Sequence, residues 1–445
     1  EAAGARSGVG CALVTGNWGA LNTPVTIDQS TDVSNVIGAG SGYDAITAFM
    51  AGGMEECVVV RVGTGGTPAT ITLKDTTTSA AVDAVVLTAL YPGNRAFTIT
   101  VKASLDDETA KEATIYEGTK ALEKVTFAAG KTEVDGIVAA FVNSKYVKAT
   151  KKAPGNGTLA DITQKAFTVG TNPTVNTAAY GEAANASEAE VRDMIIVDTN
   201  DAAVHTLIAT HVARVFQEGA YTMATVAEPS SVAIETRMQH AAAFNDEKIH
   251  YVLNPYIGTD GVEYEGYMLA ARIGGLICAG AANASLTHTV ISGAAGLKET
   301  LNSGTIKKAL KSGCLVLSTS KSKQVWIEKA INTLVTLSKD QDAGWKKIRR
   351  VRTRYELLYR ANAQSDALVG KVDPDKNGKA TIIGKIQGII NAMIKEKKLT
   401  AGTVTESTTY IADADNCYFD LDIIDKDSAE HIYSFYKFRF STNAE

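Results

Sequence analysis

The sequence predicts an α/β fold, which becomes α+β when the whole chain is counted. The expected parts are a discontinuous α/β core with a mostly parallel sheet, an inserted β-rich domain, and a C-terminal α+β subdomain that ends in an extended strand. Two observations predict it. Apolar β-branched runs alternate with amphipathic helical segments in residues 1–66 and again in residues 169–344. Residues 67–168 instead hold short alternating segments between turn residues, and residues 345–445 combine helical and extended patterns.

The first part of the core contains two apolar runs, residues 10–14 and 57–62, which predict buried strands. The second run is almost entirely β-branched, as in strands covered on both faces. The glycine-rich residues 38–42 do not match a dinucleotide-binding loop, because Tyr43 stands where the third glycine of that motif is required. We therefore interpret residues 38–42 as a connecting loop.

The inserted domain is predicted from its change of pattern. Strands are expected at residues 69–73, 84–90, 97–102 and 122–127, and a helix at residues 133–143. After residue 170 the alternation of strands and helices resumes, which implies a mostly parallel sheet with helices on its faces. The expected strands are residues 193–197, 221–226, 249–253 and 314–317, and the helices are residues 202–217, 231–244, 265–281 and 305–311.

Composition bounds the possible functions. A chain of 445 residues is too long for one core, and its net charge of −5 gives no general case for nucleic-acid binding. The five cysteines form no CxxC pair, which favours reduced thiols in a chain made in the cytoplasm. The longest apolar helical segment, residues 267–281, contains Arg272 and is shorter than the roughly 20 residues of a membrane span. The chain begins with Glu1, so we expect further residues before it.

An α/β enzyme or a nucleotide-binding module is the competing interpretation. It predicts a phosphate-binding glycine loop or a polar catalytic set at the carboxyl ends of the strands. The sequence contains no G-x-S-x-G, Walker A or HExxH motif, and its six histidines have no metal-ligand spacing. The sequence does not decide whether a Ser/His/Asp triad is present, because the members of a triad need not be close in sequence.

The spacing of Asp373, Asp375 and Asn377 matches the start of an EF-hand calcium loop. The twelfth position, where a bidentate glutamate is needed, is Gly384. We therefore reject a metal site and expect a turn that caps the following helix.

Basic residues gather after residue 345. A solvated helix face and a contact with an acidic partner surface both explain them, whereas nucleic acid is poorly supported because no aromatic stacking set accompanies them. The candidates are Lys346, Lys347, Arg349, Arg350, Arg352 and Arg354, with Lys395, Lys397 and Lys398 on the next helix as rivals.

Several motifs, in order, resemble the contractile tail sheath proteins of myophages and phage-tail-like particles. Residues 325–354 carry an expected strand with Ile-Asn-Thr-Leu at 331–334, a charged loop and a K-x-IR-x-VR helix start. Residues 270–276 with 283–287 resemble the family's small-residue helix followed by N-x-S-L-T, and residues 427–433 resemble its D-x-x-E-x-IY strand. The resemblance covers residues 10–440 and is weakest in the insertion.

This resemblance implies a structural subunit without enzymatic activity, cofactor or metal. Such subunits form stacked rings of six around a tail tube and contract from a metastable extended state. The implied partners are other copies of the chain, the tail tube protein, and baseplate and tail terminator proteins, with no direct nucleic-acid contact and no membrane insertion. The particle, a phage or a bacteriocin-like tail, would be built in a bacterial cytoplasm and be extracellular after release, with the insertion on its outer surface.

The C-terminal residues are the expected inter-subunit arm. Residues 417–423 and 432–440 alternate in polarity, as half-buried strands do. An extended arm can add to the sheet of a neighbour through main-chain hydrogen bonds. The arm residues are Ile432, Tyr433, Phe435, Tyr436, Lys437, Phe438, Arg439 and Phe440.

Overall fold

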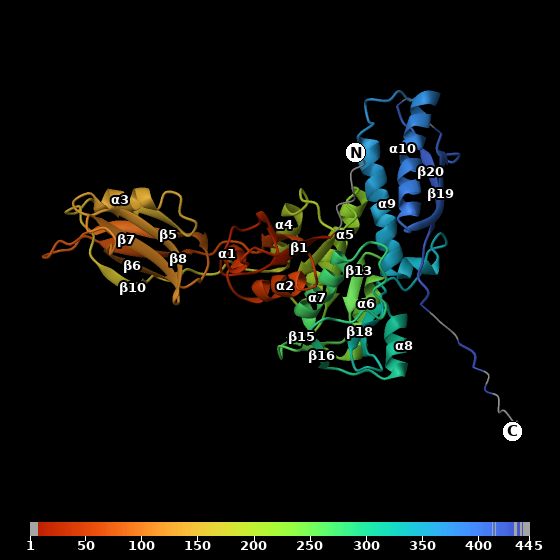
Figure 1. Ribbon diagram of the computed structural model, residues 1–445, viewed down its shortest axis with the longest axis horizontal. Coiled ribbons are helices and arrows are strands. Elements are labelled where there is room, and N and C mark those ends of the chain that lie inside the picture. Colours follow the sequence, from red (N-terminus) through yellow and green to blue (C-terminus); the bar gives the residue numbers. More distant parts are fainter. Residues whose placement is uncertain (1–7, 412, 414, 431–433, 437, 439–445) are drawn as a thin grey trace, which may run out of the picture.

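The computed structural model describes residues 8–411, 413, 415–430, 434–436 and 438 of the chain. Figure 1 shows the β-rich insertion at one end of the long axis and the α/β core in the middle. Helices α9 (Ile348–Asp366) and α10 (Lys376–Lys395) stand side by side at the other end. The fold class predicted from the sequence is confirmed.

The core sheet has eight strands among the described residues, in the order β18-β17-β13-β12-β11-β1-β3-β2. The inner six strands run parallel, and the two edge strands, β18 and β2, are antiparallel to their neighbours. The strands are β1 (Val9–Val14), β2 (Pro24–Asp28), β3 (Glu56–Arg61), β11 (Met194–Val197), β12 (Met223–Ala227), β13 (Ile249–Val252), β17 (Cys314–Thr319) and β18 (Val325–Lys329).

Helices cover both faces of this sheet. One face packs against α2 (Ser41–Met50) and α7 (Gly266–Ala279), and the other against α4 (Thr177–Ala186), α5 (Ala202–Gln217), α6 (Ile234–Phe244) and α8 (Ser303–Lys311). Gly275 lets α7 approach α2 closely, because a Cβ there would lie 2.1 Å from the carbonyl oxygen of Phe49. Within the described residues, no helix is both long and apolar enough to cross a membrane.

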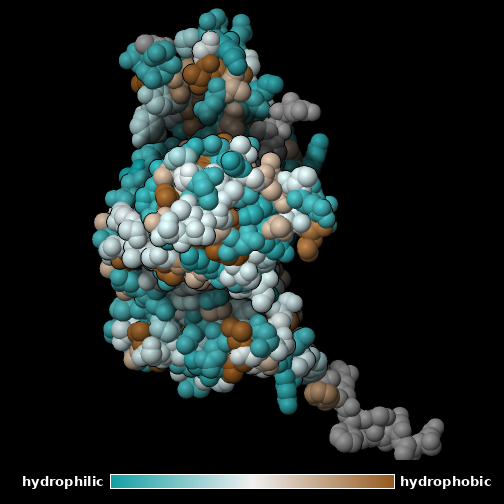
Figure 2. All heavy atoms as spheres, turned by 90° about the vertical axis from the view of Figure 1, so that its left-hand side faces the viewer, coloured by the Kyte–Doolittle hydropathy of each residue, from teal (hydrophilic) through white to brown (hydrophobic). Residues whose placement is uncertain are grey.

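The insertion is a sandwich of two antiparallel sheets, ordered β10-β6-β7-β8 and β4-β5-β9, around a separate apolar core. Its elements are β4 (Pro68–Lys74), β5 (Asp83–Pro92), β6 (Phe97–Ala103), β7 (Ala110–Glu117), β8 (Lys120–Ala128), α3 (Glu133–Ala140), β9 (Val147–Lys151) and β10 (Ile162–Ala166). Figure 2 looks onto this end of the molecule and shows a surface that is largely hydrophilic or neutral, with apolar side chains in small scattered groups.

The two chain segments that join insertion and core run side by side. Bridges pair Thr64 with Thr174 and Thr67 with Thr171, so the insertion leaves and re-enters the core at one place. The joint is also packed, because Trp18 of the core is 2% exposed and meets the rings of Tyr91 and Phe97 edge-on. The insertion is therefore held by a short ladder and by the packing around Trp18, together with an ion pair of Lys120 with Asp32 and a hydrogen bond from Tyr146 to Asn35.

Smaller elements complete the fold. A three-stranded sheet of β14 (Tyr256–Gly258), β15 (Glu263–Tyr264) and β16 (Ala294–Leu297) lies beside the core, and a hairpin of β19 (Leu399–Glu406) and β20 (Phe419–Asp425) packs on α10. The remaining elements are the short helices α1 (Ser34–Ile37) and η1 (Ala343–Lys346).

Two buried histidines make the stability of the core depend on pH. Burial lowers the pKa of His211 to about 4 and that of His250 to about 3, and nearby Arg192 and Arg352 respectively add to the effect. Below the pKa of about 6.5 of an unfolded histidine, the unfolded chain binds protons that the folded chain excludes. The free energy of unfolding should therefore fall as the pH drops from about 6.5 towards 4, by roughly 1 kcal/mol per pH unit for each histidine.

Urea unfolding between pH 7 and 4.5 would measure this slope. His250→Gln should reduce the slope, whereas His288→Gln, at an exposed position, should leave it unchanged. A His250→Gln slope equal to that of the wild type would contradict the assignment.

Candidate assembly surfaces

The segment that precedes α9 is a buried loop and not the strand expected from its sequence. Ile331 forms a single bridge to Lys347, and Asn332 and Thr333 are fully buried. The Asn332 side-chain amide donates to the carbonyl oxygen of Trp345 at 2.7 Å, and the Thr333 hydroxyl donates to that of Asp246 at 2.8 Å. These polar side chains replace ladder hydrogen bonds and fix the start of α9 against the core.

Arg352, one of the basic candidates, is turned inward. It is 6% exposed, and its Nη2 donates to the carbonyl oxygens of Gly280 at 2.7 Å and Cys278 at 3.1 Å. These carbonyls lie at the C-terminal end of α7, where a cation is favourable. Arg352 therefore joins α9 to the core and presents no charge to a partner.

Arg350 and Arg354 bind one carboxylate at the end of β20. Arg350 donates from Nε to both oxygens of Asp425 at 3.0 Å, and Arg354 donates from Nε to Oδ2 at 2.8 Å. The side chain of Asp425 is 5% exposed. The Arg354 guanidinium also lies over the ring of Trp345, 4.1 Å from its centroid. Both arginines thus hold the strand from which the C-terminal residues continue.

The next acidic residues along the chain are held in the same way. Lys347 Nζ lies 2.6 Å from a carboxylate oxygen of Asp427 and 3.2 Å from one of Glu430. The basic run of α9 and the acidic run 425–430 are therefore paired with each other. We call these contacts, made by Lys347, Arg350 and Arg354, the arm anchor.

The other basic candidates have different surroundings. Lys346 donates to the carbonyl oxygen of Val335 at 2.6 Å, and Lys398 donates to Glu356 at 2.7 Å. Among the described residues, no ion pair involves Arg349, Lys395 or Lys397, and the two lysines are exposed. Arg349, Lys395 and Lys397 are therefore the basic candidates whose charges are free to contact a tube among the described residues.

The hairpin beside α10 is a two-stranded sheet. Leu399, Val404, Phe419 and Ile423 turn towards α10, and neither outer edge is paired within the described residues. Unpaired edges of this kind accept an additional strand. Figure 1 shows the chain leaving the body after β20.

The described arm residues are exposed. Phe435 is 96%, Tyr436 80% and Phe438 92% exposed, which is unusual for aromatic side chains. The other arm candidates, Ile432, Tyr433, Lys437, Arg439 and Phe440, lie outside the described residues.

The Asp-rich turn before α10 caps that helix. Asp375 is the N-cap residue, and its Oδ1 accepts a hydrogen bond from the Gly378 amide at 2.8 Å. The helix consequently begins at Lys376. The turn caps the helix through Asp375, as predicted from the sequence. Within the described chain, no group of three His, Cys, Asp or Glu side chains is arranged to hold a metal ion.

A polar cluster that sequence reasoning missed occupies the carboxyl ends of β1 and β11. Asp198 accepts hydrogen bonds from the hydroxyls of Thr15 at 2.5 Å, Ser41 at 2.7 Å and Tyr180 at 2.7 Å. This is where strand order reverses and where open α/β sheets bind ligands. In the described chain no histidine contacts Ser41, so the cluster is not a catalytic triad, and its hydrogen bonds are satisfied internally.

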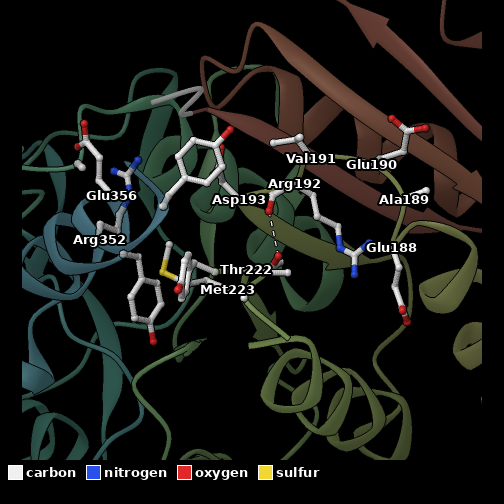
Figure 3. A pocket seen from close by; sticks show the side chains of 16 residues that line it. Glu188, Ala189, Glu190, Val191, Arg192, Asp193, Thr222, Met223, Arg352 and Glu356 are labelled. Carbon is white, nitrogen blue, oxygen red and sulfur yellow. Dashed lines mark hydrogen bonds between the residues drawn. The ribbon is translucent and has the colours of Figure 1, made fainter. Parts of the chain in front are cut away.

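A cavity of about 280 Å³ lies where α9 meets the core. Figure 3 shows Arg352 and Glu356 of α9 on one side and residues 188–193 on the other. Its wall is mainly apolar and includes Met223 and Tyr355. Arg352 of this wall makes the structural contacts described above, and Arg192 bonds to His211 at 2.9 Å.

Comparisons with known proteins agree with this fold. Residues 64–172 match the model of the phage tail sheath protein beta-sandwich domain, and residues 174–333 match that of the phage tail sheath protein central domain. Together these matches span more than half of the chain, which therefore belongs to the phage tail sheath protein family. Proteins of this family have a structural role in contractile tails.

Solved structures share the fold over nearly the full length. The sheath tail protein of Desulfitobacterium hafniense has a TM-score of 0.73 at 18% identity, covering 94% of this chain and 97% of that one. The sheath tail protein of Listeria innocua has a TM-score of 0.69 at 21% identity, covering 94% and 95%. The helical sheath of the anti-feeding prophage in its contracted state has a TM-score of 0.56 at 8% identity, covering 98% and 96%. A search of curated proteins finds no match.

The arm anchor leads to a stability prediction. Asp425→Asn removes the negative charge between two guanidinium groups, which should destabilise the β19–β20 hairpin by about 3 kcal/mol. Hydrogen exchange of the hairpin amides should accelerate accordingly. Asp415→Asn, at an exposed position of the same subdomain, is the matched control, and equal exchange in both variants would refute the anchoring role.

Proposed function

We propose that this chain polymerises as stacked rings of six around a tail tube and contracts from a metastable extended state, driving the tube through a target envelope. The observation that supports it best is that one chain carries both exposed aromatic arm residues and a two-stranded sheet whose outer edges have no partner among the described residues. Donor and acceptor lie at different places on one chain, so the contact is heterologous and can continue indefinitely. A helical array needs contacts of this kind.

The mechanism follows from strand addition. The arm of one subunit adds to the β19–β20 hairpin of a neighbour, and main-chain hydrogen bonds hold it there. The subunit bodies rotate relative to one another while this strand contact persists. The array can then shorten without dissociating, and stored conformational energy supplies the work.

The remaining parts fit this arrangement. The insertion, joined to the core at one place, is assigned to the outer surface of the sheath. The inner surface meets the tube protein, and the ends of the array meet baseplate and tail terminator proteins. The particle, a phage tail or a bacteriocin-like tail, is assembled in the bacterial cytoplasm and acts outside the cell after release. No catalytic step by this chain is involved.

The arm is tested by Tyr436→Pro. Proline removes the main-chain donor at position 436 and with it a hydrogen bond to the neighbouring strand, so the fraction of protein in tubular assemblies should fall on the order of tenfold. Negative-stain electron microscopy and sedimentation measure that fraction. Tyr436→Phe retains the amide and the ring and should assemble normally; tubes of normal abundance from Tyr436→Pro would rule out the arm mechanism.

The tube contact is tested at the exposed lysines. Reversing both charges in Lys395→Glu with Lys397→Glu should weaken co-sedimentation with tube protein, and the binding that remains should depend less on salt. Lys385→Glu, also exposed on α10, serves as the control. Unchanged binding of the double variant would remove these lysines from the tube-facing surface.

A further inference from the structure

A second cavity, of about 400 Å³, is lined by residues of α5, α6 and β13 and by the residue that follows β12. It is separate from the arm anchor and from the cavity beside α9. Part of its wall is apolar and consists of Ala202, Ala203, Ala243 and Phe244. The rest carries polar side chains, which are those of His205, Thr206, Glu228, His240 and Tyr251.

Glu228 places a buried carboxylate at this cavity. The residue is 4% exposed, and its Oε2 accepts hydrogen bonds from the Tyr251 hydroxyl at 2.5 Å and from Nδ1 of His240 at 2.8 Å. In the described chain, Oε1 accepts no hydrogen bond and is not enclosed by protein atoms, and no lysine or arginine pairs with the carboxylate. A buried carboxylate with one free oxygen and no permanent counter-charge favours a cationic ligand.

His205 contributes a second free acceptor. It is 2% exposed, and its Nε2 donates to the carbonyl oxygen of Thr199 at 3.0 Å. A neutral imidazole carries one N–H, so Nδ1 keeps its lone pair. Burial lowers the pKa of His205, which keeps the ring neutral. Within the described residues, Nδ1 has no partner and is not enclosed by protein atoms.

The donor groups of the polar side chains are already used. The Thr206 hydroxyl donates to the carbonyl oxygen of Ala202 at 2.9 Å, and Tyr251 donates to Glu228. Because Nδ1 of His240 donates as well, Nε2 of that ring is an acceptor. The side-chain atoms left free at the cavity are therefore all acceptors: Oε1 of Glu228, Nδ1 of His205 and Nε2 of His240.

We propose that this cavity binds a primary alkylammonium group. Such a group has N–H donors and no acceptor, so it matches a site whose free side-chain atoms are all acceptors. Its charge pairs with Glu228 through charge-assisted hydrogen bonds, and its alkyl chain lies against Phe244 and the alanines. A metal ion is a poorer match, because no three ligating side chains of the described chain are arranged to hold one.

This site goes beyond the proposed function and does not depend on it. The ammonium group belongs either to a free amine or to a lysine side chain of a second copy, which present the same chemistry. Both leave the cavity's acceptors to do the same work, so one probe tests them together.

NMR titration of the full chain with butylamine tests the site. Butylamine has the chain and charge of a lysine side chain, butyltrimethylammonium keeps the charge but has no N–H, and 1-butanol keeps the chain without the charge. Butylamine should bind at least about tenfold more tightly than either analogue. Absence of butylamine binding, or equal binding of butyltrimethylammonium, overturns the proposal.

Variants locate the binding. Glu228→Gln removes the charge and should weaken butylamine binding at least about tenfold, whereas Glu235→Gln, at an exposed position of α6, should leave it unchanged. Ala243→Phe fills the cavity from an exposed position, leaves the three acceptors in place and should abolish binding. Thermal unfolding checks that each variant is folded. Wild-type affinity in a folded Ala243→Phe chain places the amine elsewhere and overturns the site.

Assemblies of the chain separate the two sources of the amine. Equal binding of butylamine by subunits and by assemblies supports a free amine as the ligand. Binding that is lost on assembly, together with a carbodiimide cross-link between Glu228 and a lysine found by mass spectrometry, supports a lysine of a second copy. The titration of the subunit stands whether or not tubes form, so a failure of the proposed function leaves this test intact.

Discussion

The C-terminal subdomain depends on the ion pairs of one carboxylate, Asp425. Its side chain is almost completely buried between Arg350 and Arg354, and a buried charge is tolerated when it is paired and hydrogen-bonded. This contact fixes the end of β20 on α9, and Arg352 fixes α9 on the core through the carbonyls of α7. A pull on the chain beyond β20 is therefore transmitted to the core through three arginines of one helix.

The fold was largely predictable because the parallel sheet leaves a strong pattern. Runs such as residues 57–62 are apolar at every position, since helices cover both faces of the sheet. The elements that were missed have weak patterns. β9 is largely polar and exposed, and α4 is built mostly from alanine and small polar residues, so tertiary contacts determine their conformation. The sequence of residues 331–334 resembles that of a strand. The segment is nevertheless a loop, because its buried polar side chains bond to distant backbone groups.

The candidate surfaces were less predictable. The spacing of the basic residues indicated a helix, but Asp425, which Arg350 and Arg354 share, lies more than seventy residues away, and Arg352 bonds to backbone carbonyls. One signal was present: the basic run at 346–354 is matched by acidic residues at 425, 427 and 430. Charge complementarity within a chain can therefore indicate an internal contact before an external one is considered.

The way the insertion is attached makes it a replaceable module. Its two connecting segments lie side by side at the Thr64–Thr174 and Thr67–Thr171 bridges, so both chain connections between core and insertion are made at one place. A foreign domain with adjacent termini could take its place, provided that it offers an apolar pocket for Trp18. The ladder fixes the position of an inserted domain, and the packing around Trp18 limits its movement relative to the core.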